Sequence, residues 1–109
     1  MANAYKILGQ SAPAAATGTT LYTCPGATQT VVSVITVCNR SAIGTTFRVS
    51  IDPAAAGDSN ADYIAYDVPI GGNETLELGR GVVLNATDLL RVYNTLATLT
   101  FNAFGVEIT

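Results

Sequence analysis

The side chains here that could do chemistry are two cysteines, five tyrosines and eight carboxylates, and the chain contains no histidine. Without an imidazole, a serine or cysteine nucleophile lacks its usual general base. Cys24 and Cys38 are too few to hold zinc without further good ligands, and they form no CxxC pair. No phosphate-binding GxxxxGK[ST] or GxGxxG motif occurs. We therefore expect no enzymatic activity, no catalytic residue, and no cofactor or metal site.

The two cysteines could instead form a disulfide, which would stabilise the fold by ~3 kcal/mol in the chain-entropy model. The start of the sequence, Met1–Leu8, has no basic segment followed by an apolar one, so we expect no secretory signal. A protein made in a reducing cytosol keeps its thiols. Two separate thiols are therefore the expectation, and a Cys24–Cys38 bridge is the alternative.

The carboxylates give one weak motif. The segment Asp58–Asp62 has acidic or amide side chains at positions 1, 3 and 5 of a calcium loop. However, Tyr63 stands where the loop needs glycine, and Pro69 where it needs glutamate. We expect an ordinary polar loop there. Glu74 and Glu77 flank the start of a strand, and we expect two solvated charges.

The tyrosines allow two interpretations. Together they could form an aromatic platform that binds sugars: Tyr5, Tyr22, Tyr63, Tyr66 and Tyr93. Three of them, Tyr22, Tyr66 and Tyr93, neighbour apolar strand positions, which favours residues at the core edge with hydroxyls at the rim. The core-edge interpretation is our expectation.

Hydrophobicity alternates with a period of two along most of the chain, which predicts strands. Residues Thr46–Asp52 place Phe47, Val49 and Ile51 on one face of a half-buried strand. The segment Thr30–Asn39 is apolar on both faces, which predicts a central strand covered on both sides.

Two further segments have a less regular pattern. In Asp62–Ile70 the apolar residues Ile64, Tyr66, Val68 and Ile70 are in phase. In Ala97–Ile108 the phase slips, which predicts a β-bulge near Ala103–Gly105. We expect Asn85–Arg91 to be a turn entering a strand rather than a helix. The other expected strands are Tyr5–Leu8, Thr19–Thr23, Leu76–Leu78 and Asp88–Thr95.

These patterns predict an all-β fold, a single antiparallel β-sandwich of about seven or eight strands. Immunoglobulin-like and jelly-roll orders both remain open. Residues 1–109 are expected to form one domain, with residues 1–18 as an N-terminal arm or an edge strand. The small-residue segments Ala12–Gly18 and Pro53–Asn60 are expected to be loops, and Ala12–Ala16 and Pro53–Gly57 to touch neighbouring subunits.

The chain has few charges: 12% of its residues are charged, and its net charge is −3. Soluble domains carry roughly 25%. Its five basic residues are scattered, which argues against nucleic acid and anionic membranes as partners. The apolar run Val31–Cys38 is too short to span a bilayer. A surface this poor in charge repels neighbours weakly, so we expect a protein packed against copies of itself or a partner.

A series of landmarks resembles small virion accessory proteins of tailed bacteriophages, from about Leu8 onward. The landmarks are Leu21–Thr23 before Pro25, Val32–Ser33, Val37–Arg40, Thr46–Val49, Tyr63–Asp67, Gly81–Leu84 and Phe101–Ile108. The resemblance implies a β-sandwich that cements the head lattice or decorates the tail or baseplate. It carries over no catalytic residue.

We therefore expect a phage virion structural protein that binds and stabilises the capsid lattice, a cement or decoration protein. Its partners would be the major capsid protein or other virion subunits, and it would form a homo-oligomer. It would be located in the virion after assembly in the host cytoplasm. A tail, baseplate or fibre component with a receptor- or glycan-binding role is the alternative. A free-standing adhesin or pilus-like subunit is third, and the expected lack of an export signal disfavours it.

Overall fold

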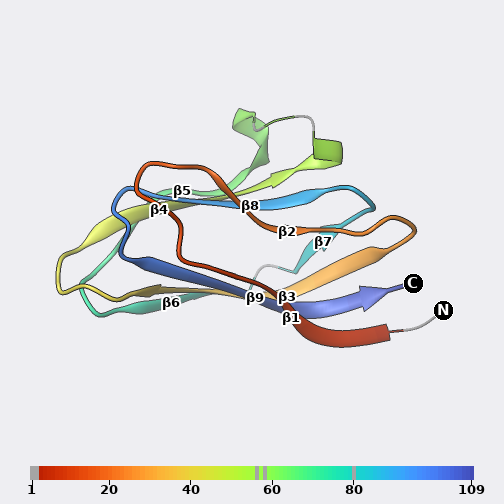
Figure 1. Ribbon diagram of the computed structural model, residues 1–109, viewed down its shortest axis with the longest axis horizontal. Coiled ribbons are helices and arrows are strands. Elements are labelled where there is room, and N and C mark those ends of the chain that lie inside the picture. Colours follow the sequence, from red (N-terminus) through yellow and green to blue (C-terminus); the bar gives the residue numbers. More distant parts are fainter. Residues whose placement is uncertain (1–2, 56, 58, 80) are drawn as a thin grey trace.

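The chain folds into two antiparallel β-sheets that pack face to face (Figure 1). The computed structural model describes residues 3–55, 57, 59–79 and 81–109. Sheet A contains β1 (Asn3–Ser11), β9 (Leu99–Ile108), β3 (Gln29–Asn39), β6 (Thr75–Leu78) and β7 (Val82–Leu84). Sheet B contains β2 (Thr19–Thr23), β8 (Leu89–Asn94), β4 (Thr45–Asp52) and β5 (Tyr63–Ile70). The predicted all-β sandwich is confirmed, with more strands than the seven or eight expected.

The order of the strands distinguishes the two sandwich types. Sheet A runs β1-β9-β3-β6, with β7 also pairing with β3, and sheet B runs β2-β8-β4-β5. Successive strands mostly alternate between the sheets; the exceptions are β4 with β5 in sheet B and β6 with β7 in sheet A. This is the order of a jelly roll, with one strand divided into β6 and β7, and not that of an immunoglobulin domain. Two short 3₁₀ turns, η1 (Pro53–Ala55) and η2 (Asn60–Asp62), lie between β4 and β5.

The core forms between the inner faces of the two sheets. Phe47 of β4 and Phe101 of β9 are fully buried and meet edge to face, with their ring centroids 6.1 Å apart. Aliphatic side chains from both sheets surround them. Burial of such side chains stabilises the fold by roughly 1.5–3 kcal/mol each. The aromatic pair therefore joins an interior strand of one sheet to an interior strand of the other.

Strand β3 is central in sheet A, as predicted, but only one of its faces is covered. It pairs with β9 on one edge and with β6 and β7 on the other. Val32, Ile35 and Val37 are buried between the sheets. Val31 and Val34 point the other way and are only half-buried. The expectation of cover on both sides was wrong, because the sandwich has only two layers.

Strand β9 is regular, so the bulge predicted at Ala103–Gly105 lies elsewhere. The register shifts occur in its two partners, between Ile7 and Gly9 of β1 and between Val32 and Val34 of β3. Leu99, Phe101 and Ala103 face the core, whereas Phe104 and Val106 face outward. The apparent slip of phase was a change from an inner to an outer apolar face.

Strand β5 does not keep the predicted phase. Tyr66 is 57% exposed, whereas Ile70 is buried. Asp67 has a positive φ of 50°, and the pairing with β4 shifts between Phe47 and Val49 at this point. The irregular backbone turns Tyr66 away from the core. The expectation that Tyr66 lies at the core edge was therefore wrong.

Individual residues anchor the two small-residue loops to the sandwich. Pro13 is buried, and the Ala16 N–H donates to the Asn94 carbonyl at 2.8 Å. In the loop after β4, the Asp52 carboxylate accepts the Gly57 N–H at 2.9 Å. Ala56 and Asp58 lie outside the described residues. Residues Asn85–Asp88 form the predicted turn into β8, because the Asp88 N–H donates to the Asn85 carbonyl at 3.0 Å.

Replacement of Gly9 tests the close approach of β1 to β2. A Cβ at Gly9 would lie 2.1 Å from the Leu21 carbonyl oxygen, which is backbone and cannot rotate away. We expect Gly9→Ala to lower the free energy of unfolding by about 2–3 kcal/mol in urea denaturation. Gly26→Ala is the control, since a Cβ there meets nothing within 4 Å. We expect it to change stability by less than ~0.5 kcal/mol. Equal effects of the two changes would contradict the close contact.

Candidate functional site

The outer face of sheet A carries an apolar surface built from four strands. We call it the A face, and it consists of Tyr5, Ile7, Val31, Val34, Val83, Phe104 and Val106. Tyr5 is 80% exposed, Val83 59% and Ile7 53%. The remaining members are half-buried. A contiguous exposed apolar surface is typical of an interaction site, whereas scattered single residues are not.

The strand register places these side chains side by side. Tyr5 is opposite Val106, Val106 is opposite Val31, and Val31 is opposite Val83. A second row joins Ile7, Phe104 and Val34. Residues paired directly across strands point to the same side of a sheet, so the two rows form one surface.

The other half of the same outer face is polar but almost uncharged. The pairing of β9 with β3 and of β3 with β6 brings Asn102, Thr36 and Glu77 into one row. Of the outward-facing residues that the structure describes in sheet A, Glu77 is the charged one. The A face therefore has no ionised side chain of its own that contact with a partner would desolvate.

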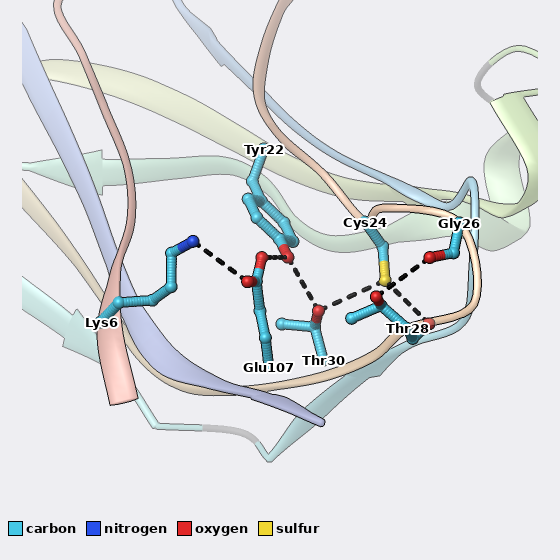
Figure 2. Close-up of polar contacts among 7 residues, drawn as sticks. All are labelled: Lys6, Tyr22, Cys24, Gly26, Thr28, Thr30 and Glu107. Carbon is cyan, nitrogen blue, oxygen red and sulfur yellow. Dashed lines mark hydrogen bonds and ion pairs between the residues drawn. The ribbon is translucent and has the colours of Figure 1, made fainter. Parts of the chain in front are cut away.

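A polar network lies behind the A face, between the sheets at one end of the sandwich (Figure 2). The Lys6 ammonium contacts the Glu107 carboxylate at 3.0 Å, and the Tyr22 hydroxyl donates to the same carboxylate. Tyr22 also shares a hydrogen bond with the Thr30 hydroxyl at 2.8 Å. The Cys24 thiol continues the network, 3.3 Å from the Thr30 hydroxyl oxygen. The network connects β1, β2, β3 and β9.

The protonation states in this network follow from burial and from its hydrogen bonds. Burial raises the pKa of Tyr22 above its ordinary value, and the hydrogen bond to Glu107 raises it further. The hydrogen bond from Tyr22, followed by that from Lys6, lowers the pKa of Glu107. The phenol therefore keeps its proton and the carboxylate stays ionised at neutral pH. Because the contacts of Tyr22, Thr30, Glu107 and Lys6 join sheet B to sheet A, we call this network the clasp.

A second cluster lies on the outer face of sheet B. The Arg48 guanidinium donates to the Asp67 carboxylate at 2.7 Å, and this bond raises the pKa of Arg48. The same guanidinium lies 4.2 Å from the Tyr66 ring centroid and 4.6 Å from that of Tyr93. Tyr63 meets Tyr66 edge to face, with centroids 4.9 Å apart. The cation is thus neutralised by Asp67 and stacked between two rings.

Tyr63 and Tyr66 also line a shallow pocket of about 370 Å³ together with Asn60. Two rings at right angles and one amide give this pocket apolar walls and a hydrogen-bonding group. Another shallow pocket, of about 350 Å³, lies beside the Asn85 turn and the end of β9, where Ala27, Thr28 and Ile108 are among its lining residues.

The structure separates most of the residues that the sequence singled out. Cys24 is buried, Cys38 is half-buried, and both are free thiols, as expected. Of the carboxylates in the calcium-like segment, Asp58 lies outside the described residues, and Asp62 accepts the Ser59 N–H at 2.9 Å. Glu74 accepts the Gly71 N–H at 2.8 Å in the preceding turn. The described residues contain no group of side chains placed to hold a metal ion.

The tyrosines divide between three environments. Tyr22 is buried, Tyr93 is half-buried, and Tyr5 lies on the A face. Tyr63 and Tyr66 meet edge to face on sheet B, so the structure does not gather the five tyrosines into one platform. The A face itself was missed as a site, although its signal was present: a central strand apolar on both sides.

Comparison with protein-family models, curated proteins and solved structures gives no match. The resemblance to phage virion proteins therefore rests on the landmark residues alone. None of the helices in the described part of the chain is long and apolar enough to cross a membrane.

Replacement of Glu107 tests the clasp through acid stability. The folded-state pKa of Glu107 lies below its unfolded value of roughly 4.3. Its contribution is thus complete above that value and is lost as the pH falls through the folded pKa. We expect the wild-type free energy of unfolding to decrease more steeply than that of Glu107→Gln between roughly pH 5 and pH 3.

The control is Glu77→Gln, which removes a carboxylate from the outer face of the same sheet. We expect it to keep the wild-type pH dependence in urea denaturation followed by circular dichroism. A wild-type slope in Glu107→Gln would show that the carboxylate is not held by Tyr22 and Lys6.

Proposed function

We propose that the chain is a structural subunit of a bacteriophage virion that binds the capsid lattice through the A face and stabilises it. The single observation that carries this proposal is the A face itself, an exposed and uncharged apolar surface on four adjoining strands. The association of the chain with a virion is inferred from the resemblance in sequence. Its attachment through the A face is inferred from the exposed apolar surface.

The physical properties of the rest of the chain support a binding role. Several of its ionisable side chains are engaged within the chain: Glu107 pairs with Lys6, Tyr22 donates to Glu107, and Asp67 pairs with Arg48. The net charge of −3 is small, so close packing against neighbours meets little long-range repulsion. Jelly rolls occur in viral capsid and lectin domains, an analogy of fold that carries no residue of this chain.

Binding to separated heads and tails of the phage that encodes the chain tests this function. We expect the fluorescently labelled protein to co-sediment with heads. Val83→Lys should weaken binding by about tenfold or more, because it brings an unpaired charge into a desolvated surface. Ile43→Lys is the matched control, since Ile43 is 66% exposed in the loop between β3 and β4 and lies off the A face.

Failure to bind either part of the particle would reject the virion role. Full binding by Val83→Lys would reject the A face as the attachment surface. Binding to tails alone would favour the second candidate function below.

The second candidate is a tail, baseplate or fibre component that binds a glycan. The observation that favours it is the pocket formed by Tyr63, Tyr66 and Asn60 on sheet B. Sugar rings stack on aromatic faces, and an amide can bond their hydroxyls. Arg48 and Asp67 neutralise each other beside the pocket, which favours a neutral sugar over an anionic one.

Saturation-transfer NMR with methyl glycosides of glucose, galactose and N-acetylglucosamine tests this second function. If the pocket binds sugar, Tyr66→Ala should remove the transfer, because Tyr66 forms one wall. Tyr5→Ala is the matched control, since Tyr5 is the more exposed tyrosine and lies on the opposite sheet. No saturation transfer from the wild-type protein to any of the glycosides, or equal transfer from Tyr66→Ala, would reject this candidate.

A further inference from the structure

Strand β1 leaves one side of sheet A open. It pairs with β9 on its inner edge, where Asn3–Ile7 match Phe104–Ile108 residue for residue. No described strand pairs with its other edge, which is the end of the sheet. The outward N–H and C=O groups of such an edge are a template for another strand. Edge strands of stable monomers are usually protected against this pairing.

The other edge strands that the structure describes carry such protection. Strand β5 contains Pro69 and the charged Asp67 with its positive φ, and its register with β4 shifts twice. Strands β2, β6 and β7 are short, with 5, 4 and 3 residues. Each of these features interrupts the row of backbone groups that a foreign strand would need.

Strand β1 lacks these features. It has 9 residues and contains no proline, and its register shift comes only after Ile7. Its charged residue, Lys6, faces the inner side of the sheet and is neutralised by Glu107 of the same chain at 3.0 Å. On the outer side, Tyr5 and Ile7 are apolar and exposed. From Asn3 to Ile7 the edge therefore has an unbroken register, no proline, and no charged residue on its outer side.

We propose that β1 pairs antiparallel with β1 of a second copy of this chain, so that two A sheets join into one continuous sheet. This inference goes beyond the proposed function, because pairing of copies needs no particle. A second copy suits this edge because two identical strands that pair antiparallel about a two-fold axis have the same length. Neutralisation of Lys6 within each copy lets the two edges meet without like-charge repulsion, despite the net charge of each chain.

The regular segment Asn3–Ile7 sets the register of the pair. Its middle residue is Tyr5, so the two-fold axis passes beside Tyr5 and places it opposite Tyr5 of the second copy. Asn3 then lies opposite Ile7 of the second copy. The tyrosines and isoleucines of both copies share the outer side, and the two A faces become one apolar surface. Addition of a strand to an open edge combines backbone hydrogen bonds with such side-chain contacts.

Sedimentation equilibrium of the full chain at several concentrations tests the pairing. We expect the wild-type chain to form a dimer. Ile7→Lys should raise the dissociation constant by about tenfold or more, because it places two new charges at the shared edge. Val83→Lys should change it by less than about twofold, because Val83 lies on the A face but far from β1 across the sheet.

A disulfide trap tests the register without relying on the charged variant. We expect Tyr5→Cys to form a covalent dimer under mild oxidation, because directly opposed residues in an antiparallel pair are about 4.5–5.5 Å apart at Cα. Ile43→Cys is the control, since it is an exposed position with the same native cysteines and lies away from the edge. We expect it to remain largely monomeric on a denaturing gel without reductant.

The outcomes separate this inference from the proposed function. A dimer that Val83→Lys retains while losing head binding supports both. A dimer without any particle binding supports the edge pairing and rejects the virion role. A wild-type chain that stays monomeric, or a dimer lost in Val83→Lys but kept in Ile7→Lys, would overturn the pairing. Equal trapping of Tyr5→Cys and Ile43→Cys would overturn the register.

Discussion

The two-layer sandwich imposes one constraint on everything else: each sheet has two faces, and the fold covers only one of them. Strands β3 and β9 are apolar on both faces. Their inner side chains form the core with Phe47, and their outer ones, Val31 and Phe104 among them, remain at the surface. These outer apolar residues are the observation on which the proposed contact with a partner rests. This conflict between local pattern and isolated fold is the main indication of function.

The distribution of charge follows from the same constraint. The charged residues that the structure describes are largely paired within the chain or placed at loops, away from the outer half of sheet A that carries Tyr5. Lys6 and Glu107 are turned inward, and Arg48 and Asp67 meet on the opposite sheet. Free charges make a surface that stays in water more soluble. A surface that binds a partner is favoured by the lack of charges, because none then has to be desolvated. The shortage of charged residues seen in the composition is therefore most evident on the half of the outer face of sheet A that carries Tyr5.

The sequence predicted the strands well because alternation is a local property. The predicted strand Thr19–Thr23 is reproduced as β2, and Phe47 and Val49 are buried as expected. It did not predict which apolar face would be covered, since a strand apolar on both sides suits a buried centre and an exposed interface equally. The sequence also did not predict the position of Tyr66, because the positive φ that makes this strand irregular occurs at Asp67 and not at a glycine. The contact of Tyr22 with Glu107 joins residues 85 positions apart and requires the topology.

The ion pair between Lys6 and Glu107 has a further consequence for the N-terminal strand. Terminal segments commonly fray, and a partner that binds them must first restrict their motion. Here the ammonium of Lys6 fastens the strand to a carboxylate that Tyr22 holds from the other layer. Much of the conformational entropy of the segment is thus already lost on folding. Preorganisation of this kind raises affinity without adding a contact, so an ion pair on the inner side of the sheet would strengthen any binding at its outer side.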